Sequence, residues 1–205
     1  TPTRRRGSWP GSATRWPEAN RMAREAVKHF SEKWYRYPYP HMSSVEGPIE
    51  GMEYPMLTFV PASAKREDLY WVLMHEFGHE WWANKVTNRD WAHMWIQEGI
   101  CVFGDAMATR ELAGEDAYLK RMQQTARATQ NRLPVVRGEE VDSDSAYYGD
   151  IYGKGAFFMH TLRYVMGDDV FFPTLKKLAT APQYTYDNTV TTTDVEQLFS
   201  GAHGK

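Results

Sequence analysis

Apolar side chains recur every three or four residues over residues 18–34. They would fall on one face of a helix: Met22, Ala26, Val27, Phe30 and Trp34. This period predicts an amphipathic helix with one buried face. The next segment, residues 37–40, alternates tyrosine with proline, and a residue before proline is disfavoured in helical conformation. We therefore expect the helix to stop before Pro38 and extended chain to follow.

The segment after residue 40 contains several glycine and proline residues, which favour turns. The runs at residues 42–45 and 56–60 predict two short strands, with residues 50–55 between or beside them. The next run, residues 66–83, is apolar on nearly every side, which is typical of a helix buried in the middle of a domain. A polar connection at residues 84–90 separates it from a second helix over residues 91–112.

The second half of the chain continues the helical pattern. We expect helices at residues 115–128, 152–165 and 168–179, separated by an acidic loop at residues 138–145 and by Gly167. The predicted fold class is α+β, mostly helical, with a small sheet.

Composition limits the classes of partner. The 205 residues suffice for one sizeable domain or two small ones, and we expect a linker or poorly ordered arm at residues 1–17 before a domain at residues 18–205. The chain has 24 basic and 26 acidic residues, and its net charge of −2 offers no global attraction for nucleic acid or anionic lipid. One cysteine, Cys101, allows no intrachain disulfide.

Targeting signals are not evident either. No run reaches the roughly 18 apolar residues that a membrane span requires, and the first residues do not follow the pattern of a signal peptide. The chain is expected to be soluble, without an assigned compartment.

A metal-binding pattern lies in the predicted central helix. In the sequence from His75 through Glu76 to His79, the two histidines stand at positions i and i+4, so both imidazoles point to one side and can reach one metal ion. Glu76 is rotated by about 100° from His75 and would take a proton from a water on the metal without being a ligand.

Two histidines leave a catalytic zinc ion one protein ligand short. Glu98 lies nineteen residues after His79 in the next predicted helix, and a crossed or antiparallel arrangement would return its carboxylate to the metal. His93 is an alternative third ligand.

With these residues in place, the chain resembles the gluzincin zinc aminopeptidases of the aminopeptidase N and leukotriene hydrolase type. The resemblance rests on the His75–His79 motif and on Glu98 within Gln97-Glu98-Gly99, where the family has N-E-G. Two further segments match: Gly51-Met52-Glu53-Tyr54-Pro55 resembles G-x-M-E-N with Tyr54 in place of asparagine, and Tyr152-Gly153-Lys154-Gly155-Ala156 resembles Y-x-K-G-A.

The resemblance implies a role for each matched residue. One Zn²⁺ ion would be held by His75, His79 and Glu98, with Glu76 as general base. Glu53, supported by Gly51 and Met52, would bind the free ammonium of a peptide substrate, and Glu50 is a weaker candidate. Tyr152 would donate to the oxyanion, with Tyr147 and Tyr148 as alternatives, whereas Lys154 is either a positioning or a surface residue.

The sequence also suggests a residue that orients the metal ligands, and the resemblance bears on the rest of the protein. Asp105, two turns after Glu98, is a candidate for orienting a metal-bound histidine. The resemblance implies a thermolysin-like catalytic domain. Whole family members have a β-rich domain before this part and a helical domain after it, so we expect further N- and C-terminal domains beyond these residues.

The predicted reaction is hydrolysis of the N-terminal peptide bond of a peptide by water activated by zinc and Glu76. Two alternatives stay open from the sequence. A thermolysin-like endopeptidase would share the zinc ligands but would not need Glu53 to bind an ammonium group. A catalytically silent module would keep the metal site and only bind peptides.

Overall fold

A computed structural model describes residues 16–47, 49–138 and 141–204. The predicted arm lies outside these residues except at residues 16 and 17, where the first helix already begins. The chain divides into two compact units, Thr1–Asn84 and Lys85–Lys205. Most described residues are helical and a small sheet accompanies them, as the sequence predicts.

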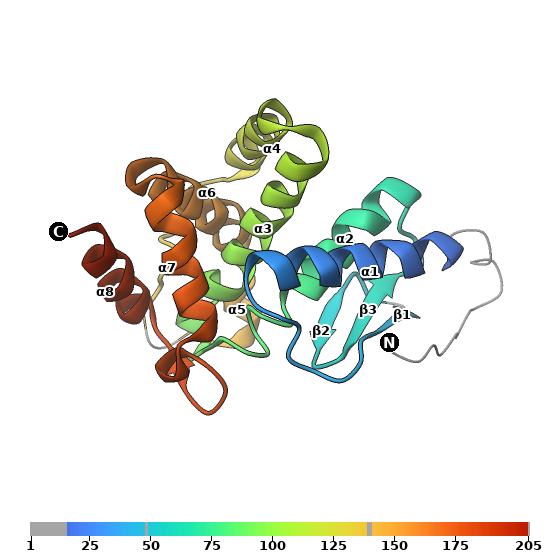
Figure 1. Ribbon diagram of the computed structural model, residues 1–205, viewed down its shortest axis with the longest axis horizontal. Coiled ribbons are helices and arrows are strands. Elements are labelled where there is room, and N and C mark those ends of the chain that lie inside the picture. The colour runs from blue at the N-terminus through green and yellow to red at the C-terminus, as the bar shows by residue number, and fades with distance from the viewer. Residues whose placement is uncertain (1–15, 48, 139–140, 205) are drawn as a thin grey trace. The chain divides into compact units, whose positions relative to one another are not determined.

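Two helices of the first unit pack against each other (Figure 1): α1 (Trp16–Lys33) and α2 (Arg66–Gly78). The predicted apolar face of α1 is the buried one, including Met22, Ala26 and Phe30. Just after α1, the Trp34 ring stacks on Phe30 with the ring centroids 4.2 Å apart. This stacking adds about 1 kcal/mol of stability beyond what burial of the two rings contributes.

The sheet of the first unit has the order β1-β3-β2. Its strands are β1 (Ser43–Gly47), β2 (Met52–Tyr54) and β3 (Leu57–Pro61). β1 runs parallel to the central strand β3, and β2 runs antiparallel to it, with Glu53 opposite Thr58. Both predicted strands are present, and the segment between them supplies the third. Helix α2 contacts β2 and β3, so the edge strand that contains Glu53 borders the helix that contains His75.

The predicted helix over residues 66–83 is too long. α2 ends at Gly78, and the next residues form tight turns in which Trp81 N–H donates to the Gly78 carbonyl at 3.0 Å and Asn84 N–H donates to the His79 carbonyl at 3.0 Å. These turns bury both Trp81 and Trp82, and each ring lies edge-on to Trp34. Apolar character on every side reflects burial here rather than continued helix.

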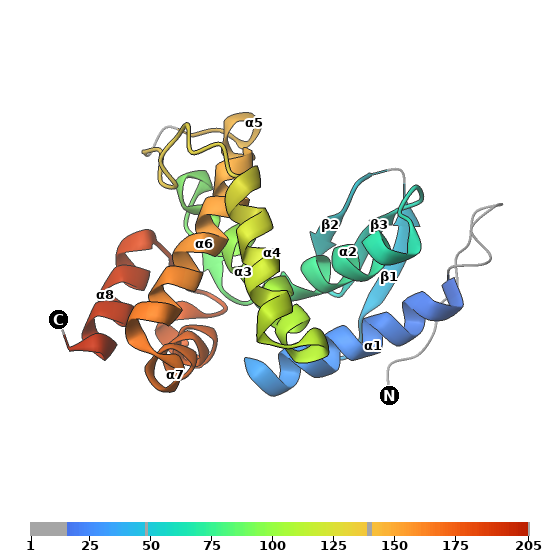
Figure 2. The same ribbon diagram turned by 90° about the horizontal axis from the view of Figure 1, so that it is seen from above.

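Three helices of the second unit lie side by side (Figure 2): α3 (Trp95–Ala113), α4 (Glu115–Ala128) and α6 (Gly149–Met166). α7 (Asp168–Thr180) packs on α6, and α8 (Thr192–His203) packs on α7. The remaining elements are short: β4 (Thr87–Asn88), η1 (Trp91–His93), α5 (Ser143–Ala146), η2 (Pro182–Tyr184) and β5 (Thr189–Val190). β4 and β5 pair in parallel.

The helices predicted for residues 115–128 and 168–179 are confirmed to within one residue. The helix predicted for residues 91–112 is instead a 3₁₀ turn, which the Asp90 side chain caps by accepting from Ala92 N–H, followed by α3 from Trp95. α6 begins three residues before Tyr152, and the acidic loop contains the short helix α5.

The sequence interpretation missed α8. Its start is fixed by a capping box in which Thr191 accepts from Asp194 N–H while the Asp194 carboxylate accepts from Thr191 N–H. Its buried positions, Val195, Leu198 and Phe199, follow the helical period. Within the described ranges, we find no helix with the length and apolar character needed to cross a membrane.

Candidate functional site

The first unit brings His75 and His79 together at the end of α2. Their Nε2 atoms lie 3.1 Å apart, and the ring planes stand at 88° to each other. His79 is 1% exposed, whereas His75 is half-buried. The i, i+4 spacing therefore aims both imidazole nitrogens at one point, as the sequence predicts.

The backbone after α2 fixes the protonation of the His79 ring. His79 Nδ1 lies 3.0 Å from the carbonyl oxygen of Trp82, and a carbonyl can only accept, so Nδ1 is the protonated nitrogen. In the neutral ring, Nε2 then presents its lone pair toward His75. Metal-binding histidines have this arrangement, in which the second ring nitrogen donates to a carbonyl or carboxylate. The donor set and its orientation fit a zinc ion.

Two carboxylates join this end of α2. One carboxylate oxygen of Glu53, one of Glu76 and one ring nitrogen of His79 all lie within 4.8 Å of one another. Glu76 is 7% exposed, and Glu53, on strand β2, is half-buried. Because two carboxylates at this separation repel each other, the site favours a cation between or beside them.

Gly51 explains how strand β2 comes so close to Glu76. A Cβ atom at this position would lie 2.3 Å from Glu76 Oε1, and the φ angle of +147° is one that other residues rarely adopt. Gly51 thus places the backbone against the Glu76 carboxylate. Met52 follows at the start of β2, opposite Phe59 of β3.

Glu80, which the sequence interpretation passed over, is a further acidic residue beside the site. Its carboxylate is fully buried and accepts from Met56 N–H at 3.0 and 3.2 Å and from the Tyr37 hydroxyl at 3.1 Å. Burial raises the pKa of Glu80 to about 7, although these hydrogen bonds favour the ionised form. The available signal was an acidic residue directly after the second histidine in an otherwise apolar stretch.

The second unit contains Glu98 in the first turn of α3, where it is 3% exposed. Next to it, Gly99 faces Gly155 of α6 so closely that a Cβ atom on Gly99 would lie 2.7 Å from the Gly155 Cα. The two helices can cross at this distance only because both residues lack a side chain. The structure therefore joins two of the four matched segments, the one at Glu98 and the one at Tyr152.

Tyr152 is half-buried in the first turn of α6, and the loop of residues 131–134 is held beside that turn. The Asp150 carboxylate accepts from the backbone N–H groups of Asn131, Arg132 and Leu133 at 2.8–3.2 Å. Burial alone would raise the pKa of this carboxyl, but the three donors hold it below its usual range. Lys154 donates to the Leu133 carbonyl at 3.0 Å, so this lysine fastens the loop.

The alternative site residues have partners of their own in the second unit. His93 Nδ1 lies 3.0 Å from the Thr192 hydroxyl, and Tyr148 donates to the Pro134 carbonyl. Tyr147 is exposed and packs against Trp91 with the ring centroids 5.9 Å apart. Asp105 is buried in α3, two turns after Glu98, and its role toward a histidine stays a prediction.

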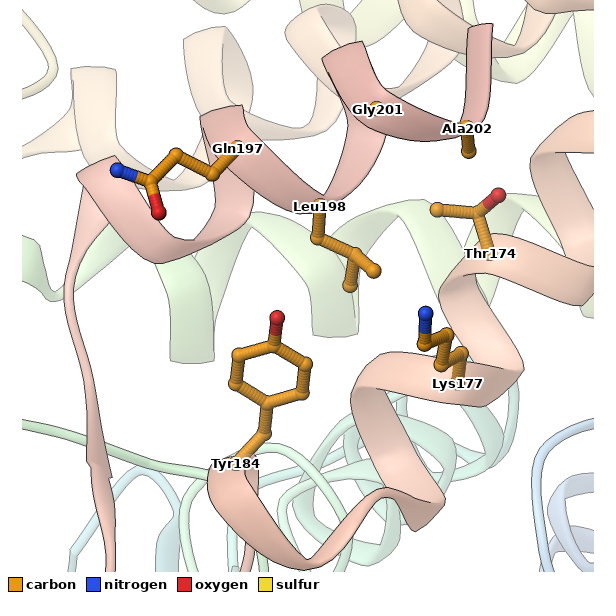
Figure 3. Close-up of a pocket in the computed structure, with 7 residues that line it drawn as sticks. All are labelled: Thr174, Lys177, Tyr184, Gln197, Leu198, Gly201 and Ala202. Atoms are coloured by element: carbon orange, nitrogen blue, oxygen red, sulfur yellow. The ribbon is translucent and has the colours of Figure 1, made fainter.

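A separate pocket of about 380 Å³ lies between α7, η2 and α8 of the second unit (Figure 3). The Tyr184 hydroxyl and the Lys177 ammonium point into the same space beside Leu198. Thr174, also on its wall, already donates its hydroxyl hydrogen to the Val170 carbonyl at 2.7 Å. Among the residues that line this pocket there is none that the sequence predicted for the site.

Comparisons with known proteins identify the family of the chain. Residues 24–204 match the model of the peptidase family M1 domain. Aminopeptidase B of Rattus norvegicus is 33% identical over 154 residues, 68% of this chain and 23% of that protein. Leukotriene A-4 hydrolase of Xenopus laevis is 32% identical over 138 residues, which is 61% of this chain and 23% of that protein.

Solved structures extend the similarity to the fold. An M1 zinc metallopeptidase variant from Deinococcus radiodurans, crystallised with the substrate Tyr-Ser-Ala, is 26% identical with a TM-score of 0.77. The match covers 97% of this chain and 44% of that one. The chain therefore spans less than half of this neighbour and about a quarter of the curated relatives.

Proposed function

Since this chain belongs to peptidase family M1, we propose that it is the catalytic part of a zinc aminopeptidase. Its substrates would be peptides with a free N-terminus, and the reaction would be hydrolysis of the first peptide bond. The domain would be thermolysin-like, and the preceding and following domains of whole family members would complete the protein.

The observation that carries the proposal is the pairing of His75 with His79. Their Nε2 atoms are 3.1 Å apart, and the Trp82 carbonyl already selects the tautomer of His79 that a metal requires. A structural pair of histidines in a protein core would not need this tautomer together with two adjacent carboxylates.

We propose Glu98 as the third protein ligand. Its place in the matched Gln97-Glu98-Gly99 triplet supports this role, and its burial in the first turn of α3 keeps the carboxylate away from bulk water. Two histidines and one glutamate form a catalytic zinc set that keeps a position open for water.

Bound there, a zinc ion would lower the pKa of its water to about 7 and polarise the substrate carbonyl. Glu76 lies beside His79 and would take the proton of the attacking water and deliver it to the leaving amine. Tyr152 would donate its phenolic hydrogen to the oxyanion that develops on the carbonyl oxygen.

Glu53 would determine that cleavage occurs at the N-terminus. Its carboxylate stands within 4.8 Å of the Glu76 carboxylate and of His79, so an ammonium group bound by Glu53 would hold the first peptide bond near the general base. Gly51 and Met52 would present the backbone of β2 to the substrate, as an edge strand can.

Zinc content measured together with peptide hydrolysis tests the proposal. We expect one zinc per chain and cleavage of an aminoacyl amide but not of its N-acetylated form. Glu76→Gln should retain the zinc and lose about 10²- to 10⁴-fold in kcat, the usual contribution of a general base. Glu32→Gln, on the exposed face of α1, is the matched control and should match the parent.

Each contrary result points to a different class. Equal cleavage of the free and acetylated substrates would indicate an endopeptidase. Full zinc content without hydrolysis by the parent would indicate a binding module, and absence of zinc would contradict the metal site itself.

A further inference from the structure

The buried carboxylate of Glu80 connects three segments of the first unit. It accepts from Met56 N–H in the turn between β2 and β3, from the Tyr37 hydroxyl after α1, and from the Asn84 side chain at 3.4 Å. Glu80 itself directly follows His79 in the chain. The amide of Met56 is therefore tied to the residue next to a proposed metal ligand.

The turn that Glu80 holds has a constrained backbone. Met56 has a φ of +64°, a left-handed conformation that is uncommon for a residue with a side chain and persists only where its surroundings enforce it. Its N–H donates to Glu80, and its carbonyl accepts from Ser43 N–H at 2.9 Å. Hydrogen bonds on both sides of the residue thus fix the conformation of the turn.

This turn sets the position of Glu53. Strand β2 has only three residues, and its last pair, Tyr54 with Leu57, directly flanks the turn. A shift of the Met56 amide is therefore passed to Glu53, which lies within 4.8 Å of His79 and Glu76. A displacement of about 1 Å is enough to weaken a binding or catalytic geometry strongly.

We propose that Glu80 is a positioning residue for substrate recognition, which holds the Met56 turn so that Glu53 faces the amino group of the substrate. The inference rests on the proposed aminopeptidase function. It adds that the length of the side chain at position 80, rather than its charge, adjusts the affinity for the substrate's amino end.

Two variants separate length from charge. Glu80→Gln keeps the length, and its amide oxygen can still accept from Met56 N–H while its NH₂ group donates to the Tyr37 hydroxyl, which can turn to the His41 carbonyl at 2.9 Å. Glu80→Asp keeps the charge but is one methylene too short to reach Met56 without moving the turn. Tyr39→Phe is the control, since it removes a hydrogen bond to the Asn84 carbonyl without touching the turn.

The measurements are KM and kcat for an aminoacyl amide, with kcat expressed per protein chain and the zinc content determined separately. We expect Glu80→Asp to raise KM about tenfold with a smaller change in kcat, and Glu80→Gln and Tyr39→Phe to stay within about threefold of the parent KM. A merely structural role would lower the active fraction, and hence kcat, without moving KM.

The binding of L-tryptophan and N-acetyl-L-tryptophan, measured by calorimetry, gives a second readout that needs no turnover. We expect Glu80→Asp to weaken the binding of L-tryptophan and to leave the binding of N-acetyl-L-tryptophan unchanged. The inference is overturned if Glu80→Gln loses as much as Glu80→Asp, or if KM and L-tryptophan affinity stay at the parent values in both. A parent that neither cleaves nor binds the free amine overturns the proposed function, which is a distinct result.

Discussion

At the scale of single residues, the candidate site depends on which atom each side chain turns toward its neighbours. The Trp82 carbonyl holds the Nδ1 proton of His79 and so leaves Nε2 facing His75. Gly51 lets the backbone of β2 approach Glu76, and Glu80 fastens the turn that follows β2. Each contact involves a backbone group, so the positions of the functional side chains depend on the path of the chain around them.

Tyr152→Phe tests the proposed oxyanion donor. The ring remains, so folding and zinc content should be unchanged, but loss of the hydroxyl should lower kcat about 10²- to 10³-fold because the donor acts mainly in the transition state. Steady-state hydrolysis of an aminoacyl amide measures the effect. Tyr148→Phe is the control, and a larger loss in that variant would transfer the role to Tyr148.

Gly51→Ala tests the close approach to Glu76. The added methyl group would meet Glu76 Oε1 at 2.3 Å, so we expect kcat/KM to fall more than tenfold as the base is displaced. Gly138→Ala is the matched control, because Gly138 also has a positive φ but a Cβ atom added there would meet no other atom within 4 Å. It should cost about 1 kcal/mol of stability without affecting hydrolysis. Equal activities of the two variants would contradict the role of Gly51.

At the scale of elements, two helices cross where glycine meets glycine. Gly99→Ala would place a methyl group 2.7 Å from the Gly155 Cα, so α3 and α6 must separate, and we expect a loss of about 1–3 kcal/mol in the free energy of unfolding. Gly201→Ala, in α8 with open space around it, should instead gain up to about 1 kcal/mol. Urea unfolding measures both, and a tolerated Gly99→Ala would mean that the contact is not tight.

Because Asp150 holds the loop beside α6, the stability that this loop contributes should depend on pH. Since its folded pKa is lowered, its stabilising effect is present above the unfolded pKa of about 4 and is lost as the pH falls through the folded value. Asp150→Asn should therefore cost about 2 kcal/mol at pH 7, and the difference from the parent should shrink below pH of about 4. Urea unfolding from pH 7 to pH 3 measures this, and a constant difference would exclude ionisation of Asp150 as the cause.

At the scale of the whole molecule, a metal ion would link ligand binding to folding. If the chain binds zinc only when folded, zinc at 100 times its Kd adds about 2.7 kcal/mol to stability. We expect a chelator to lower the Tm of the parent and added zinc to restore it. His79→Ala should show neither response, and Glu98→Ala should need a higher zinc concentration. An identical zinc response in Glu98→Ala would exclude Glu98 as a ligand.

The sequence by itself determined the family, the class of fold and most helices. Residues 75–79 place two imidazoles on one side of a helix through local geometry alone, and the periods of α1, α4 and α7 are equally local. The motifs around Glu53, Glu98 and Tyr152 could be found in the same way, because each is a short run of residues.

Only the tertiary structure decided the contacts between distant segments. It ended α2 at Gly78, where the following turns bury two tryptophans, and it showed that Glu80 reaches back to Met56 and Tyr37. It also placed Gly99 on Gly155 and the 131–134 loop on Asp150. No local period encodes these pairings, because the partners are far apart in the chain and meet only when packing brings their backbones together.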